Sequence, residues 1–253
     1  MKWFEQLYKK EFINIVGFKS DEETQIEANF IIDKLGLVPG SKVLDLCCGY
    51  GRHSYLIAKN ADFEVTGIDL SEDYIKIANR EKSTPKTKYL IGDMRDLPFK
   101  NHFDAVINMF TSFGFFENDL ENEQVIKKVN KSLKIKGKFL LDYENKFNFV
   151  HNDVFLNEKS WNKIDNQNFI LFENRYDIIN EREIFSAQFY RNGVLINKIG
   201  YNIRLYSFPE IKKILNQNGF EIIDFWGDYQ SNPYSVKSKR VIILSEKIKN
   251  IVN

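Results

Sequence analysis

Hydrophobic residues follow two different patterns in the part of the chain from about residue 20 to residue 145. Short apolar runs alternate with segments in which apolar residues recur every three or four positions. Apolar runs of this length predict buried strands, and the longer spacing predicts helices. Strands are predicted over residues 43–46, 63–68, 87–91, 103–108 and 138–143. Strands that alternate with helices are typical of a parallel sheet with right-handed crossover connections.

The pattern changes near residue 150. From residue 169 to residue 206 there is no helical period, and strand-like runs cover 169–179, 182–191 and 194–206. Asn192-Gly193 separates the last two runs and is a strong signal for a type I′ hairpin turn. These runs predict an antiparallel insert, either as a cap over a functional site or as an interface between subunits.

From residue 207 the helical pattern returns. Ser207 and Glu210 have the spacing of a capping box at the start of a helix, which ends at Gly219. Two further strands are predicted over 220–226 and 240–245, with a loop but no helix between them. Strands connected in this way form a hairpin, so they are expected to be antiparallel.

A tight glycine turn follows the first predicted strand. Gly49 and Gly51 lack a Cβ atom, so the backbone there can adopt positive φ and pass close to a ligand. The next helix, which begins at Arg52, would point its amide groups at the same place. Asp69 ends the second strand about 20 residues later, where a carboxylate suits a ribose diol, and Asp93 follows the third. We therefore expect a ligand crevice at one edge of the sheet.

These residues resemble the motifs of a known family. The run Asp-Leu-Cys-Cys-Gly-Tyr-Gly at 45–51 is similar to the first motif of the class I S-adenosylmethionine-dependent methyltransferases, with Cys47 where a glycine often stands. The runs at 67–71, 92–94 and 103–106 are similar to its next three motifs, in order. The resemblance covers roughly residues 20–145 and 207–247, and it is closest to the small-molecule, N-methyltransferase-like branch.

This resemblance implies a fold and a division of the chain. The fold would be α/β, with a Rossmann-like, doubly wound, mostly parallel seven-stranded sheet whose last strand is antiparallel, and an antiparallel β insert after strand five. Residues 1–150 and 207–253 would form the S-adenosylmethionine-binding methyltransferase domain. Residues 151–206 would form the insert, as a cap or a dimer interface.

The resemblance also implies contacts with S-adenosyl-L-methionine, which leaves as S-adenosyl-L-homocysteine. Asp45 would lie near the ammonium group of the cofactor, Asp69 would bind the ribose hydroxyls, and Asp93 would accept the adenine amino hydrogens. The aromatic segment 1–19 predicts a helix packed by its apolar stripe or, by resemblance, a lid over the cofactor. The residues assigned to the cofactor are Tyr8, Asp45, Cys47, Gly49, Gly51, Asp69, Leu70, Asp93, Met94, Asn108 and Met109.

The acceptor side is less defined. The segment 109–116 resembles the acceptor wall of small-molecule N-methyltransferases, and aromatic walls suit a cationic centre. The same phenylalanines would serve equally well as core residues. Six residues are candidates for binding the acceptor, although packing or surface roles explain each of them as well: Phe113, Tyr143, Arg204, Tyr206, Tyr229 and Arg240.

No catalytic base is assigned. His53 lies in the helix after the glycine turn, where a structural role is the simpler interpretation. His102 in a turn and His151 in a loop have no partner that the sequence reveals. Arg52, beside the glycine turn, would either meet a carboxylate or cap a helix.

Composition restricts the partners and the location. The formal net charge is +1, which provides no overall basic field for a nucleic acid. The two cysteines are neighbours, and no histidine or cysteine spacing around them predicts a metal site. No apolar run is long enough to span a bilayer, and the charged first residues do not form a signal peptide. We therefore expect a cytoplasmic protein.

The leading interpretation is a methyltransferase for a small-molecule acceptor, with an amine as the candidate, and with homodimerisation through the insert. The same cofactor site would also suit an RNA or protein methyltransferase. A nicotinamide oxidoreductase is disfavoured, because Gly49-Tyr50-Gly51 lacks the third glycine of the dinucleotide fingerprint. A non-enzymatic protein that binds the cofactor and a partner remains a further alternative.

Overall fold

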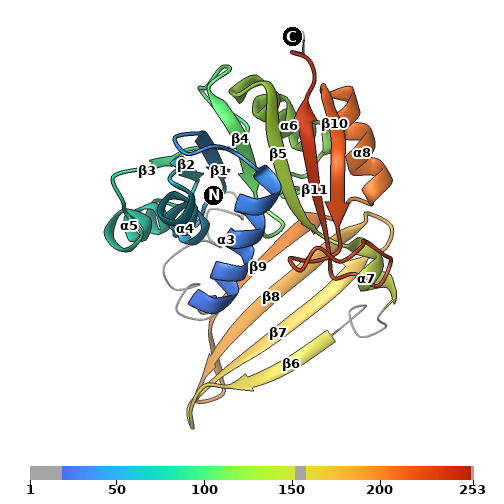
Figure 1. Cartoon of the computed structure of the whole chain (residues 1–253). Coiled ribbons are helices and arrows are strands. Elements are labelled where there is room, and N and C mark those ends of the chain that lie inside the picture. Colours follow the sequence, from blue (N-terminus) through green and yellow to red (C-terminus); the bar gives the residue numbers. More distant parts are fainter. Residues whose placement is uncertain (1–18, 152–157, 252–253) are drawn as a thin grey trace.

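The computed structural model describes residues 19–151 and 158–251 (Figure 1). Tyr8, predicted at the cofactor, and the aromatic segment around it lie outside the described residues. In the part of the chain that is described, no helix combines the length and the apolar character that crossing a bilayer requires.

A seven-stranded sheet forms the larger part of the structure. Its strand order is β10-β11-β5-β4-β1-β2-β3. β1 to β5 run parallel, whereas β11 is antiparallel to both β5 and β10. The predicted mostly parallel sheet with an antiparallel last strand is therefore confirmed. The strands are β1 (Lys42–Leu46), β2 (Glu64–Asp69), β3 (Thr87–Ile91), β4 (Phe103–Asn108), β5 (Leu133–Glu144), β10 (Phe220–Trp226) and β11 (Arg240–Lys247).

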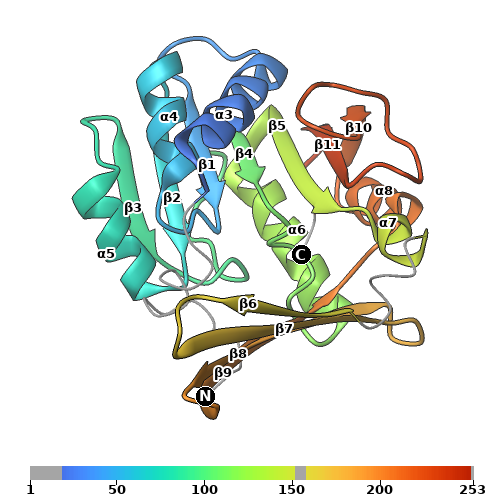
Figure 2. The ribbon, with the colours of Figure 1, turned by 90° about the horizontal axis from the view of Figure 1, so that it is seen from below.

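Helices cover both faces of this sheet (Figure 2). Because side chains alternate along a strand, each strand contributes to two separate cores. Leu44 of β1 belongs to the core under α6 and α8, and Val43 belongs to the core under α3 and α4. The helices are α3 (Asp21–Leu35), α4 (Arg52–Ala61), α5 (Glu72–Glu81), α6 (Asp119–Ser132), α7 (Lys146–His151) and α8 (Phe208–Gln217).

The second sheet is antiparallel, with the order β6-β7-β8-β9. Its strands are β6 (Glu158–Lys163), β7 (Asn168–Asp177), β8 (Arg182–Arg191) and β9 (Val194–Arg204). β7, β8 and β9 agree with the predicted runs, and Asn192 and Gly193 have φ values of 51° and 78°, as a type I′ turn requires. β6 was missed, because its mostly exposed residues show no alternation of apolar and polar side chains. The division into two domains stays a prediction.

In Figure 1 this second sheet, which we call the insert sheet, lies below the carboxyl ends of the parallel strands. The end of the insert sheet nearest the main sheet belongs to the main core, because Tyr176, Ile203 and the adjoining Leu205 pack in the cluster that contains Phe113 and Tyr143. The backbone N–H of Arg204 also donates to the carbonyl of Gly114, over 2.9 Å. The insert sheet therefore joins the main sheet through the loop that follows β4.

Candidate active site

The predicted carboxylates lie at one edge of the main sheet. Asp45 pairs in register with Gly67, and Asp69 pairs with Ile91, so β1, β2 and β3 end side by side. Asp93 comes two residues after the end of β3. Asp69 and Asp93 thus belong to neighbouring strands at the same edge, as a nucleoside site requires.

Asp69 connects β2 to the glycine turn. Its Oδ2 accepts a hydrogen bond from the Gly49 N–H at 2.8 Å, and its Oδ1 accepts one from the Ser71 N–H at 2.9 Å. Burial raises the pKa of this carboxyl group to about 6, against the effect of these backbone N–H donors. Each oxygen keeps a further lone pair, so the carboxylate can accept from a diol while it holds the turn. Leu70, assigned to the adenine, is 42% exposed beside it.

Asp45 is in a different environment. It is 1% exposed, and its Oδ2 accepts a 2.6 Å hydrogen bond from the Ser54 hydroxyl of α4. Burial raises the pKa of the Asp45 carboxyl group, although the charges of His53 and Arg52 oppose the shift. Asp45 therefore lies beneath the glycine turn, and its contact with the cofactor ammonium stays a prediction.

The two glycines of the turn have different surroundings. Both have positive φ, as predicted. A Cβ atom on Gly49 would meet no atom within 4 Å, so this position is open to a ligand. A Cβ atom on Gly51 would lie 2.7 Å from the hydroxyl of Tyr89. Gly51 is therefore required by packing against a tyrosine as well as by the turn.

Cys47 adopts φ 62°, a conformation that glycine favours, which explains why a glycine is common at this position of the motif. Its Sγ lies 3.5 Å from the Sδ of Met94, so the glycine turn contacts the segment after β3. Burial raises the pKa of the Cys47 thiol well above its usual value. This thiol is packed and unreactive rather than activated.

Asn108, at the end of β4, tests whether the site suits the cofactor. Its Nδ2 donates to the Leu46 carbonyl at 2.9 Å, which fixes the amide orientation. Its Oδ1 is buried and has no hydrogen-bond partner among the described residues. A buried acceptor without a donor costs about 1–3 kcal/mol. A ligand ammonium group at this edge would donate to Asn108 Oδ1, so this acceptor fits the methionine end of the cofactor.

Asp93 has a partner that the sequence did not suggest. Arg95 reaches back to both oxygens of Asp93, with Nη2 2.6 Å from Oδ2, and its Nη1 donates to Glu121 of α6 at 2.6 Å. The guanidinium of Arg95 also lies over the ring of Phe116, 4.2 Å from its centroid. The Asp-x-Arg spacing just after a strand was the available signal. Contact of Asp93 with adenine stays a prediction.

Three of the acceptor candidates are buried in one aromatic cluster. Phe113 lies 5.3 Å from Tyr206 and 6.2 Å from Tyr143, measured between ring centroids. The Tyr143 hydroxyl donates to the Arg204 carbonyl, and the Tyr206 hydroxyl lies 2.5 Å from the Asp119 carboxylate. In this structure these side chains hold the insert sheet to the main sheet, and their contact with an acceptor stays a prediction.

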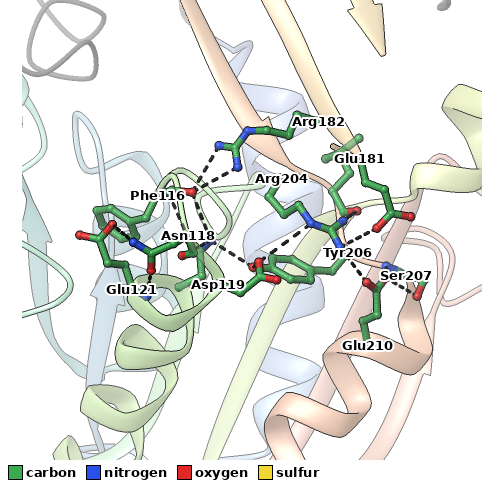
Figure 3. Close-up of polar contacts among 12 residues, drawn as sticks. Phe116, Asn118, Asp119, Glu121, Glu181, Arg182, Arg204, Tyr206, Ser207 and Glu210 are labelled. Carbon is green, nitrogen blue, oxygen red and sulfur yellow. Dashed lines mark hydrogen bonds and ion pairs between the residues drawn. The ribbon is translucent and has the colours of Figure 1, made fainter. Parts of the chain in front are cut away.

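Arg204 belongs to an ion-pair network at the same junction (Figure 3). Its Nη2 contacts Glu181 at 2.5 Å and Glu210 of α8 at 2.8 Å. Lys146 of α7 pairs with the same two carboxylates. In Figure 3, Arg182 also points from β8 to the Phe116 carbonyl, 3.3 Å away. The network fixes the position of the insert sheet, and Arg204 is fully engaged in it.

The last two acceptor candidates converge on Asp142, a buried residue of β5 that sequence reasoning missed. Asp142 accepts a 2.6 Å hydrogen bond from the Tyr229 hydroxyl and is ion-paired with Arg240. It also accepts the Phe110 N–H at 2.8 Å. Phe110 and Thr111 both have positive φ, near 59° and 58°. A polar residue inside the apolar strand 138–143 was the signal that could have identified Asp142.

Arg52 and His53 have structural roles. Both contact the Glu27 carboxylate of α3, His53 through Nε2 at 2.8 Å. Burial alone would raise the pKa of Glu27, but the hydrogen bond and charge of His53, with the charge of Arg52, lower it to about 2. The cluster fixes α3 against α4, so His53 is not a candidate base.

Comparison with known proteins identifies the chemistry of this edge. Residues 43–137, which contain β1 to β4 and the glycine turn, match a family model described as a methyltransferase domain. This part of the chain is therefore a methyltransferase domain. The chain is 27% identical over 220 residues to the putative methyltransferase YqeM of Bacillus subtilis, covering 84% of this chain and 86% of that one.

Solved structures share the fold of nearly the whole chain. The chain superimposes on the CcbJ methyltransferase of Streptomyces caelestis with a TM-score of 0.78 and 16% identity, over 97% of this chain and 96% of that one. It also superimposes on CalS10, an amino pentose methyltransferase of Micromonospora echinaspora solved with S-adenosylmethionine bound. That TM-score is 0.68 at 16% identity, over 96% of this chain and 97% of CalS10. Both alignments therefore include the insert sheet as well as the cofactor edge.

Proposed function

We propose that this methyltransferase transfers the methyl group to an amine of a small molecule. The observation that supports this most directly is a row of aromatic rings on the insert sheet. Tyr201 stacks on Phe185 with 5.0 Å between centroids, Phe185 stacks on Phe172 at 5.9 Å, and Phe115 meets Tyr201 edge-on at 6.0 Å. Aromatic faces attract cations, and an amine is cationic both on arrival and as the methylated product.

The likeness to CalS10 supports the same proposal. CalS10 is described as an amino pentose methyltransferase, and its alignment with this chain extends over nearly all of both proteins. The likeness therefore includes the insert sheet, and not only the cofactor motifs.

The division of labour follows from the chemistry. Bound S-adenosylmethionine supplies a methyl carbon that its positive sulfur makes electrophilic. The protein holds the ligands in line and excludes water, which together supply most of the rate enhancement expected for such a transfer. In this proposal Asp69 and the Gly49 turn hold the nucleoside, and Asn108 accepts from the methionine end. The insert sheet, which Arg204 fixes to the main sheet, covers the acceptor.

Transfer of a labelled methyl group to a panel of small molecules tests the proposal. The panel pairs each amine with the alcohol of the same skeleton, for example an amino sugar with the parent sugar. We expect label only on amines. Transfer to the alcohols instead, or cofactor binding without transfer to any member, would contradict the amine assignment.

We also propose a cytoplasmic location and a homodimer formed through the insert sheet. The supporting feature for the dimer is the edge strand β9, where Val194, Leu195 and Ile196 are exposed by 64%, 47% and 55%. An exposed apolar edge strand favours pairing with a second chain. Light scattering of the purified protein measures the oligomeric state directly.

A further inference from the structure

Two carboxyl groups from different sheets lie near enough for each to act on the other through its charge, and one of them adjoins the aromatic row. Glu183 of β8 is only 3% exposed and accepts hydrogen bonds from Asn174 Nδ2 at 2.9 Å and from the Tyr201 hydroxyl at 3.1 Å. Glu144 is the last residue of β5. Its side chain forms no hydrogen bond and no ion pair with any described residue. Glu144 thus comes from the main sheet and Glu183 from the insert sheet, and the charge of Glu144 acts on Glu183.

The electrostatics of this pair are unfavourable without a cation. Burial, and next the charge of Glu144, raise the pKa of Glu183 to about 8. Burial also raises the pKa of Glu144, with Arg240 opposing the shift and Asp142 adding to it. Arg240 is ion-paired with Asp142, and no ion pair joins it to Glu144 or Glu183 among the described residues. A buried carboxylate without a counter-ion is costly, and glutamine would make the same hydrogen bonds to neutral donors at lower cost.

A third hydrogen-bond acceptor at this place also lacks a donor. The Oδ1 of Asn174 is buried and has no hydrogen-bond partner among the described residues, although its Nδ2 donates to Glu183. Tyr201, which donates to Glu183, is also the central ring of the aromatic row. The place thus combines two carboxyl groups, an unsatisfied amide oxygen and ring faces. All of these groups attract a positively charged hydrogen-bond donor, and no described side chain provides one.

We infer that Glu183 and Glu144 bind the ammonium form of the acceptor and that Glu183 takes the proton that must leave it before methyl transfer. The inference rests on the proposed function, since it requires an amine acceptor. The proton passes from the ammonium nitrogen to a carboxylate oxygen of Glu183, the N–H bonding pair remains on nitrogen as the lone pair, and the net charge of ligand and carboxyl pair is unchanged. The neutral amine is then the nucleophile, and no further reactant is required.

The groups around the pair set the proton affinity of Glu183. From β7, Asn174 donates to it and Tyr176 is its neighbour across the strands. From β9, the Tyr201 hydroxyl donates a hydrogen bond to Glu183. From β5, the negative charge of Glu144 raises the pKa of Glu183. Because burial and the charge of Glu144 raise the pKa of Glu183 to about 8, this carboxylate is a stronger base than an ordinary one and is better matched to an ammonium donor, since proton transfer is most efficient between groups of similar pKa.

The test uses cyclohexylamine and cyclohexanol as probes, which share a skeleton and differ in charge. Calorimetry is performed on the full chain saturated with S-adenosylhomocysteine. We expect the wild-type protein to bind the amine about tenfold more tightly than the alcohol, since carboxylate and ring contacts of this kind contribute on the order of 1–2 kcal/mol. Glu183→Gln and Glu144→Gln should each abolish this preference.

Glu173→Gln is the matched control. Glu173 lies on β7 next to Asn174, and its carboxylate is engaged by Lys159 at 2.6 Å and by Gln188 at 2.6 Å. This variant should keep the preference for the amine. A preference retained in both Glu183→Gln and Glu144→Gln would overturn the inference. If Glu183→Gln does not fold, Glu144→Gln decides the question, because its side chain makes no described hydrogen bond that folding requires.

A second readout separates the base from a mere charge. If Glu183 removes the proton, Glu183→Gln should methylate an amine of the panel more slowly than the wild-type protein at pH 7, and the difference should shrink as the pH rises through the pKa of the free amine, where the amine arrives neutral. A rate loss that is the same at every pH would overturn the proton-acceptor role. Failure of S-adenosylhomocysteine to bind the wild-type protein would instead contradict the methyltransferase assignment, so the two failures are distinguishable.

Discussion

At the carboxyl ends of the parallel strands, the half around Asp69, which we propose for the cofactor, and the half around Asp142, which we propose for the acceptor, hold their carboxylates in different ways. On the cofactor half, Asp69 accepts from the backbone N–H groups of Gly49 and Ser71, which are 20 and 2 positions away in the sequence. On the acceptor half, Asp142 accepts from Tyr229 and Arg240, which are 87 and 98 positions away. The cofactor half is therefore built by neighbouring segments, and the acceptor half by distant ones.

This difference has a consequence for stability. A carboxylate held by backbone amides of its own turn can be lost with local effects only. A buried carboxylate that neutralises a distant arginine affects the stability of the whole protein, since its removal leaves a buried charge unpaired. Loss of the Asp142 carboxylate should therefore strongly destabilise the protein, whereas loss of the Asp69 carboxylate should mainly weaken binding of the cofactor.

The largest effect is expected for Asp142→Ala. Removing this carboxylate leaves the guanidinium of Arg240 without its partner and the Phe110 N–H without its acceptor. We expect the free energy of unfolding to fall by about 3–5 kcal/mol, measured by urea denaturation. The exposed ion-pair residue Glu72 provides the control, and Glu72→Ala should change it by less than about 0.5 kcal/mol. A loss below about 1 kcal/mol for Asp142→Ala would contradict the comparison.

The next largest effect is the loss in acid of the stability that the Glu27 cluster contributes. The folded pKa of Glu27 is lowered from 4.5 to about 2, so its ionised form stabilises the folded state above pH 4.5. This contribution, about 3 kcal/mol, is lost as the pH falls from 4.5 to about 2. Urea denaturation at pH 7 and pH 3 should show the gap between wild type and Glu27→Gln shrinking at the lower pH. A gap independent of pH would refute the assignment.

Asp69→Ala sharpens the cofactor side of the comparison. The side chain is expected to bind the ribose, so the variant should lose about 10- to 100-fold in affinity for S-adenosylhomocysteine, measured by calorimetry. Its unfolding should change less than that of Asp142→Ala. His102→Ala is the control, because His102 is exposed and packs on Phe99 away from the strand tips. Equal losses in the two variants would show that the cofactor site has been placed wrongly.

The smallest effect on stability is expected at the edge of the insert sheet. Leu195→Lys introduces a charge at an exposed position of β9, so the free energy of unfolding of the monomer should change by no more than about 0.5 kcal/mol. If β9 pairs with a second chain, the same substitution should convert the dimer into a monomer, as measured by light scattering. A dimer that survives Leu195→Lys would exclude this edge as the interface.

Much of the acceptor half was beyond reach from the sequence. The sequence located Tyr143 at the end of the fifth strand and Arg204 and Tyr206 in the insert, as candidates for binding the acceptor. Their engagement in packing and ion pairs depends on partners far along the chain, which the sequence did not reveal. Glu183 left a signal that could have been used. It shares its strand face with Phe185, Ala187 and Phe189, and a carboxyl group on the apolar side of an alternating strand is unusual.

The amino-acid sequence by itself determined the order of strands and helices, the glycine turn and the carboxylates at the strand tips. These features depend on periodicity and turn chemistry, which act over a few residues. Only the tertiary structure decided which polar side chains neutralise one another and which remain without a partner. The physical reason is that burial and Coulomb interactions depend on distance in space, and folding brings Thr111 within 2.9 Å of Arg240 across 129 positions of sequence.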